Sequence, residues 1–114
     1  IRVRSIVGRF LEHSRAYCFT NGGNHSVWIG SADLMHRNLD RRVEALVSLE
    51  DPEHVAELYD LFDLASSPTT AAWDLDVHGS WNRRLTDESG SARQDLQEYL
   101  IREKTKRTTA LGSA

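Results

Sequence analysis

The strongest constraint on the fold of this chain is a turn signal between two short β-like runs. Residues 16–20 and 26–29 are rich in aromatic and β-branched side chains, which favour strands. Between them, Asn21-Gly22-Gly23-Asn24 supplies residues that tolerate the left-handed backbone of a tight turn. The pattern predicts a β-hairpin. Its first run is apolar on both faces, which predicts a covered, central strand.

The rest of the chain alternates between helical and strand patterns. Apolar residues at helical spacing, with polar residues at the starts, predict three helices: residues 5–11, residues 52–66 after a capping Asp51, and a last helix after a capping box of Ser91 and Gln94. Alternation predicts a third strand from Arg42 to Leu49, and residues 73–82 read as a second hairpin. Together these elements predict an α/β fold, a small mixed β-sheet flanked by helices.

Length and composition describe one domain. A chain of 114 residues with 39% hydrophobic and 27% charged residues is typical of a globular domain, and we expect it to span residues 1–107, with a flexible tail at 108–114. Its single cysteine, Cys18, excludes an internal disulfide and fits a reducing, cytoplasmic compartment. No apolar run approaches the roughly 18 residues of a transmembrane segment. The first residue is Ile1, and no signal peptide follows, as expected of a stretch cut from a longer protein.

Charge is unevenly distributed along the chain. Residues 1–42 carry seven Lys+Arg and three acids, a net +4, whereas the remaining 72 residues carry seven basic and fourteen acidic residues, a net −7. A basic segment inside an acidic chain predicts a local anion site. Nucleic acid is not the expected partner, because no lysine precedes Lys104 and no nucleic-acid-binding motif is present.

The basic segment combines arginines with a histidine. Guanidinium forks match phosphate oxygens, and His13 can exchange a proton near neutral pH, so the segment suits phosphoryl chemistry. Taken alone, His13 reads more readily as a surface residue or helix cap, and Arg37, Arg41 and Arg42 as solvated charges. The remaining histidines have no Cys or carboxylate at metal-ligand spacing. Cys18 lies within an apolar strand, which argues against a role as a nucleophilic thiol.

Three blocks of sequence resemble the last domain of the bacterial polyphosphate kinase family: Ser5–Arg15, Gly30–Asp33 and Met35–Glu44. That family reversibly transfers the terminal phosphate of ATP to inorganic polyphosphate. The resemblance runs from Ile1 to about the last helix and covers only the C-terminal portion of a longer enzyme. It implies ATP/ADP and polyphosphate as partners, the remaining domains of the same polypeptide, and a homo-oligomer. It also implies Mg²⁺ with the nucleotide, held by ligands outside this chain.

The family's catalytic domains are similar to phospholipase D folds, in which two halves face each other. His13-x-Arg15 resembles the His-x-Lys signature of that fold with arginine for lysine, and Gly30-Ser31-Ala32-Asp33 resembles its Gly-Ser-x-Asn block with Asp for Asn. Leu34 departs from the family, which often has tryptophan there. The resemblance implies a phospholipase D-like half in which His13 is the second, acid–base histidine. The phosphorylated histidine would belong to the preceding domain.

The resemblance also implies a set of site residues that bind ATP or phosphate: His13, Arg15, Ser31, Arg37, Asn38 and Arg42. Among them only His13 is expected to be catalytic, and the isolated fragment is expected to be inactive. Two alternatives stay open at this point. One is half of a phospholipase D-like phosphodiesterase, and the other is a non-catalytic phosphate-binding module.

Overall fold

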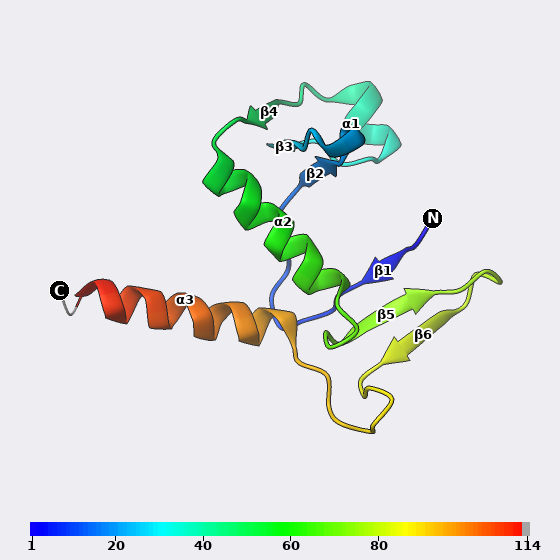
Figure 1. The fold of residues 1–114 in the computed structure, drawn as a ribbon. Helices are drawn as coiled ribbons and strands as arrows, with labels where there is room; N and C mark the ends of the chain where they lie inside the picture. The colour runs from blue at the N-terminus through cyan, green and yellow to red at the C-terminus, as the bar shows by residue number, and fades with distance from the viewer. Residues whose placement is uncertain (113–114) are drawn as a thin grey trace. The chain divides into compact units, whose positions relative to one another are not determined.

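The structure is a computed structural model that describes the main chain of residues 1–112 and the side chains of residues 1–37, 40–106, 108 and 109. Its elements, shown in Figure 1, are β1 (Arg4–Ser5), β2 (Ala16–Phe19), a 3₁₀ turn η1 (Asn21–Gly23), β3 (Ser26–Gly30), α1 (His36–Arg41), β4 (Leu46–Leu49), α2 (Pro52–Ser66), β5 (Ala72–Leu75), β6 (Trp81–Arg84) and α3 (Leu96–Gly112). The predicted α/β class is confirmed. The strands form two three-stranded sheets, and both are antiparallel.

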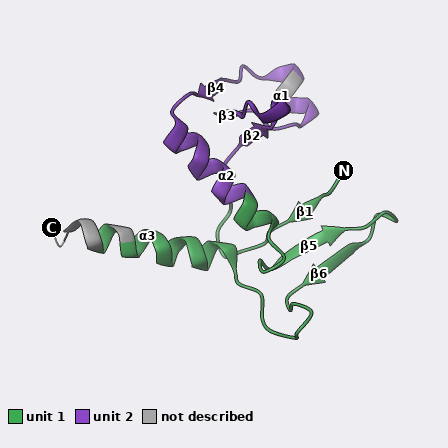
Figure 2. Cartoon of the chain, in the orientation of Figure 1, with its two compact units in different colours: residues 1–11, 63–114 green, residues 12–62 purple. Residues whose placement is uncertain are grey.

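The chain divides into two compact units. One is continuous, residues 12–62, and the other combines residues 1–11 with residues 63–114 (Figure 2). Each unit contains one of the two sheets, with strand order β2-β3-β4 in the first and β1-β5-β6 in the second. Among the described residues, no helix is long and apolar enough to cross a membrane.

The predicted first hairpin is confirmed in the unit 12–62, where Ala16 pairs with Ile29 and Phe19 with Ser26. Its turn uses the left-handed backbone that the glycines allow, with φ of 64° at Gly22. The prediction that the first strand is central is wrong. β3 is the central strand, because β4 adds to the free edge of β3 and not to β2.

The third predicted strand is shorter than its alternation indicated. β4 begins at Leu46 and not at Arg42, because residues 36–41 form helix α1 and the chain needs residues 42–45 to return to the sheet. Gly30 at the end of β3 makes this return possible. A Cβ at Gly30 would collide with the carbonyl oxygen of Ala45 and with Leu46. The absence of a side chain at Gly30 therefore lets the next strand approach closely.

Helix α2 begins and ends as the sequence predicts. The carboxylate of Asp51 accepts a hydrogen bond from the main-chain N–H of Glu53 at 2.8 Å, which is the geometry of an N-cap. Within the unit 12–62, Tyr59 of α2 packs edge-on against His25, with 4.3 Å between ring centroids. Burial raises the pKa of Tyr59, and it also raises the pKa of the nearby Cys18 thiol.

The predicted helix over residues 5–11 is wrong, because this stretch bonds instead to residues that are far away in the sequence. Arg4 and Ser5 form strand β1 on β5. Further along, the side chain of Gln97 holds the main chain of Phe10 through two hydrogen bonds. Strand pairing and this amide satisfy main-chain groups that a helix would have used internally.

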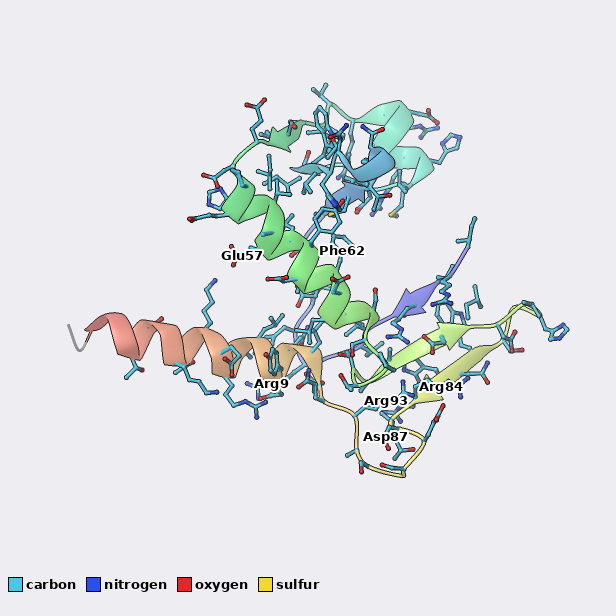
Figure 3. All side chains as sticks on the ribbon, viewed as in Figure 1. Arg9, Glu57, Phe62, Arg84, Asp87 and Arg93 are labelled. Atoms are coloured by element: carbon cyan, nitrogen blue, oxygen red, sulfur yellow. The ribbon has the colours of Figure 1, made fainter. Side chains whose placement is uncertain are left out.

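The second predicted hairpin is confirmed as β5 and β6. The turn that connects these strands has the same sequence pattern as a second turn, which lies between β6 and α3. Asp76 to Ser80 and Asp87 to Ser91 are both Asp-x-x-Gly-Ser turns, in which the Asp Oδ1 atom accepts the main-chain N–H of the serine, at 2.8 and 2.9 Å. Figure 3 shows Asp87 and Arg93 in the loop between β6 and α3. The hydrogen bond from the Ser80 N–H lowers the pKa of the Asp76 carboxyl, and the hydrogen bonds from the Ser89 hydroxyl and then from the Ser91 N–H lower the pKa of the Asp87 carboxyl.

Helix α3 starts later than the capping box predicts. Ser91 closes the second of these two turns, and Gln94 forms a bridge with Thr70, so neither residue is free to cap. Asp95 caps the helix instead, accepting from the N–H of Glu98 at 3.0 Å. α3 continues to Gly112, which makes residues 108–112 helical where the sequence predicts a tail. Residues 113 and 114 lie outside the described residues.

Candidate functional site

One edge of the β2-β3-β4 sheet brings together segments that are far apart in the sequence. Because both strand pairs are antiparallel, the start of β2, the end of β3 and the start of β4 lie at the same edge. Main-chain hydrogen bonds connect them there, from Gly30 N to Arg15 O at 3.2 Å and from Ser31 N to Ala45 O at 3.1 Å. We call the segments that meet here, residues 13–15, 30–33 and 42–45, the site edge.

Arg15 is the most strongly bonded residue of the site edge. Its Nε and Nη2 atoms donate to the two carboxylate oxygens of Asp33, each at 2.7 Å. Its Nη1 atom donates to the carbonyl oxygen of His13 at 2.8 Å. The side chains of Arg15 and Asp33 are only 28% and 30% exposed. The hydrogen bond to Asp33 raises the pKa of Arg15 above its ordinary value, and an arginine guanidinium is a permanent cation in any case.

Ser31 lies in the Gly-Ser-Ala-Asp turn, residues 30–33, which also contains Asp33. Its hydroxyl donates to a carboxylate oxygen of Glu44 and accepts the main-chain N–H of Ala45, at 3.2 Å in the second case. One residue further, the Tyr17 hydroxyl donates to the carbonyl of Ala32 at 2.6 Å. The Gly-Ser-Ala-Asp turn is therefore bonded to β2 and to the segment before β4.

The bonds of this turn have a common spacing. Asp33 binds Arg15, two residues after His13, and Ser31 binds Glu44, two residues after Arg42. The imidazole of His13 and the guanidinium of Arg42 are both on exposed residues. The turn therefore anchors the two segments that carry these groups at one edge.

The remaining predicted residues lie on helix α1 or beside it. Arg37 is exposed on α1 and Arg42 is exposed just after it, and neither makes an ion pair among the described side chains. The side chain of Asn38, also predicted to bind phosphate, lies outside the described residues. On the same helix, His36 Nδ1 lies 2.7 Å from Asp40, four residues later, so the expectation that no other histidine is paired with a carboxylate is wrong for His36.

The described residues form no ready-made cluster of metal ligands. Within them, no group of three or more His, Cys, Asp or Glu side chains could hold a metal ion. The two carboxylates of the site edge are engaged, Asp33 by Arg15 and Glu44 by Ser31.

Sequence reasoning identified Asp33 as part of a motif but missed its partner, and it missed the bond between Glu44 and Ser31. Both contacts join residues 13 or 18 positions apart, and their pairing depends on the sheet register. The only signal in the sequence was the placement of an acid where the phospholipase D pattern has an amide, together with an arginine where it has a lysine.

Most of this chain matches a known protein family and several of its members. The family model "Polyphosphate kinase C-terminal domain 2" matches residues 1–96. Polyphosphate kinase of Streptomyces coelicolor is 55% identical over 101 residues, which is 89% of this chain and 14% of that protein. Polyphosphate kinase of Mycobacterium avium is 56% identical over 101 residues, 89% of this chain and 13% of that protein.

A solved structure gives the same result. The crystal structure of polyphosphate kinase from Porphyromonas gingivalis superimposes with a TM-score of 0.80 and 30% sequence identity, covering 96% of this chain and 16% of that one. The chain thus spans only about a seventh of the length of these relatives. The resemblance found in the sequence motifs is confirmed, and the chain belongs to the polyphosphate kinase C-terminal domain 2 family.

Proposed function

We propose that this chain is the C-terminal part of a polyphosphate kinase that reversibly transfers the terminal phosphate of ATP to inorganic polyphosphate, and that the site edge faces the reacting phosphates. The observation that carries this proposal is the antiparallel order of β2, β3 and β4, since it places the segments bearing His13 and Arg42 at one edge. The names of the relatives favour the kinase over a phosphodiesterase or a binding module.

In this proposal the residues of the site edge and of helix α1 have separate tasks. Arg42 and Arg37 hold phosphate oxygens, because exposed guanidinium groups present planar forks of the required shape. His13 gives or takes a proton as the ADP oxygen or the nitrogen of the phosphorylated histidine leaves. Phosphoryl transfer depends mainly on positioning and charge stabilisation. Asn38 is included in the set of phosphate ligands on the strength of the family resemblance alone.

The rest of the assembly is part of the same proposal. The phosphorylated histidine lies in the preceding domain of the same polypeptide, arranged with this domain as two phospholipase D-like halves. Mg²⁺ accompanies the nucleotide and is held by residues outside this chain. The whole enzyme is a cytoplasmic homo-oligomer that takes ATP or ADP and polyphosphate.

The test is a set of substitutions in the full-length enzyme. His13→Asn should lower turnover by about 10²–10⁴-fold, the usual loss when acid–base help is removed. Arg42→Lys should lower kcat/KM by about tenfold or more, because a lysine cannot reproduce the fork and one charged hydrogen bond is worth about 1.5–3 kcal/mol. Arg42→Ala should be worse than Arg42→Lys.

The matched control is Arg2→Ala, which removes an exposed arginine at a distance in sequence from the site edge. It should leave kcat/KM unchanged. A normal Arg42→Lys enzyme would remove Arg42 from the site. A His13→Asn enzyme within about twofold of the parent would contradict acid–base catalysis by His13, since that help is worth at least about 10²-fold.

A further inference from the structure

We infer that Arg15 and Asp33 are a positioning pair, which fixes the main chain at His13 and thereby sets the place from which its imidazole acts. The inference rests on the proposed role of His13 and assigns Arg15 a task other than phosphate binding. Arg15 bonds both oxygens of Asp33 at 2.7 Å and the carbonyl of His13 itself at 2.8 Å. The pair therefore links the end of β3 directly to the residue that would move the proton.

The geometry of the pair suits a rigid anchor. Two parallel N–H···O bonds between a guanidinium and a carboxylate fix the plane of both groups. Both side chains are about 70% covered, so solvent screens the pair less than an exposed ion pair. A third bond to the main chain of His13 transmits this rigidity along the backbone, whereas a side-chain contact would leave the backbone free.

The imidazole of His13 needs such an anchor. His13 is exposed and precedes β2, outside any helix or strand. Within the described residues, the hydrogen bond that the structure gives to His13 is the one its carbonyl accepts from Arg15. Small displacements of a catalytic group cost about 10²-fold in rate for about 1 Å, so the bond is placed where positioning matters most.

The same contacts argue against Arg15 as a phosphate ligand. A guanidinium carries five N–H donors in a fixed fork. Three of its N–H groups are directed at Asp33 and His13. The Nε and Nη2 atoms, which could together hold two phosphate oxygens, are occupied by the Asp33 carboxylate. Arg42 shows no such internal partner among the described side chains, which leaves its fork available.

The other unit contains a matched pair without a candidate site. Arg4 Nε donates to Asp74 at 2.8 Å, and the two side chains are 24% and 32% exposed. Arg4 Nη1 also donates to main-chain carbonyls, those of Ala65 and Ser67. Arg84 Nε also lies 3.7 Å from Asp74. Asp74→Asn therefore perturbs an arginine–aspartate contact of similar burial and reports what a structural loss outside the site edge does to the enzyme.

The experiment uses the full-length enzyme with ATP and polyphosphate. Asp33→Asn and Arg15→Gln should each lower kcat by about tenfold or more, as expected for a displaced catalytic group, with little change in KM for ATP. Asp74→Asn should lower the unfolding temperature about as much as Asp33→Asn, without the loss in kcat. Arg15→Lys, which keeps the charge and loses the fork, serves as a milder variant if Arg15→Gln does not fold.

A double-mutant cycle with His13 decides the mechanism. If Asp33 acts through His13, Asp33→Asn should cause no further loss of kcat in an enzyme that already carries His13→Asn, because effects of residues that act as a unit are not additive. Multiplying losses would overturn the inference. A raised KM in Arg15→Gln with a normal or lower KM in Asp33→Asn would also overturn it, since freeing Arg15 would then improve phosphate binding.

The cycle separates this inference from the proposed function. If His13→Asn leaves turnover normal, the proposed function of the site edge fails. If His13→Asn is inactive while Asp33→Asn and Arg15→Gln retain the parental kcat, the positioning pair is refuted and the role of His13 stands. A loss of kcat in Asp74→Asn equal to that in Asp33→Asn would reduce the pair to general stability.

Discussion

The side-chain amide of Gln97 bonds both main-chain polar groups of Phe10. Its Oε1 atom accepts the N–H of Phe10 at 2.8 Å, and its Nε2 atom donates to the carbonyl oxygen of Phe10 at 2.8 Å. The side chain thus makes the two main-chain hydrogen bonds that a neighbouring strand would make at this residue. Gln97 is only 6% exposed and both bonds are partly buried, so they are costly to lose.

Gln97→Glu is expected to lower the free energy of unfolding. The carboxylate cannot donate to the carbonyl of Phe10 and would leave it unpaired, at a cost of about 1–3 kcal/mol. Chemical denaturation of the 114-residue chain measures the effect. The control is Gln94→Glu, because Gln94 bonds Thr69 and Ala71 through its main chain. Equal midpoints for the two variants would contradict the role given to the Gln97 side chain.

Gly30→Ala is expected to weaken the unit 12–62. The new methyl group would meet the main-chain oxygen of Ala45, and a main-chain atom cannot rotate away as a side chain can. Overpacking of this kind costs about 1–3 kcal/mol. Hydrogen exchange at β3 and β4 measures it. Gly22→Asn is the control, since a Cβ there meets nothing within 4 Å and asparagine tolerates its φ of 64°. Unchanged protection in Gly30→Ala would rule out the close approach.

Asp76→Asn and Asp87→Asn are expected to reduce the acid sensitivity of the fold. Hydrogen bonds from Ser80 at the first carboxyl, and chiefly from Ser89 at the second, depress both pKa values in the folded state. A depressed folded pKa adds stability that is present above the unfolded pKa, near 4, and is lost as pH falls through the folded pKa. Unfolding temperatures measured from pH 7 to pH 2 should therefore fall less steeply below about pH 4 in either variant.

The control for this pH series is Asp63→Asn, on helix α2 and outside both turns. It should retain the parental slope. If the two turn variants follow the same curve as the parent down to pH 2, then the hydrogen bonds of the turns do not persist in solution.

The 114-residue chain alone is expected to lack kinase activity. In the proposed mechanism the phosphorylated histidine lies in a preceding domain, and the chain covers only 14% of a full-length relative. Incubation with ATP, Mg²⁺ and polyphosphate should release no ADP above background. Full-length enzyme under the same conditions is the positive control. Sustained turnover by the pure chain would contradict the division of the catalytic histidines between two domains.

Local signals in the sequence predicted the elements whose partners are near in the chain. The glycine turn before β3, the Asp51 cap of α2 and the hairpin of β5 and β6 all depend on neighbouring residues. The predicted helix over residues 5–11 failed because its competitors are distant. Arg4 pairs with Asp74, and Phe10 with Gln97, at separations of 70 and 87 residues.

The candidate site was predictable as a set of residues but not as an arrangement. The motifs marked His13, Arg15, Ser31 and Arg42, since their spacing resembles that of a known family. Spacing could not show that Asp33 engages Arg15 or that Glu44 engages Ser31, because those bonds exist only once β3 has paired with both of its neighbours. The motif therefore predicted which residues form the candidate site. The strand pairing determines which of them anchor the segments and which remain exposed.

The division of the chain into a continuous unit and a divided one has a consequence for its synthesis. The unit that carries the site edge is complete once residue 62 has left the ribosome, whereas the other unit waits for residues beyond 63 to join residues 1–11. Domains generally fold as units during synthesis, those nearer the N-terminus first. Strand β1 precedes its partner β5 by about 70 residues, so we expect Arg4 and Ser5 to stay unpaired at a stage when the segment with His13 can already be anchored.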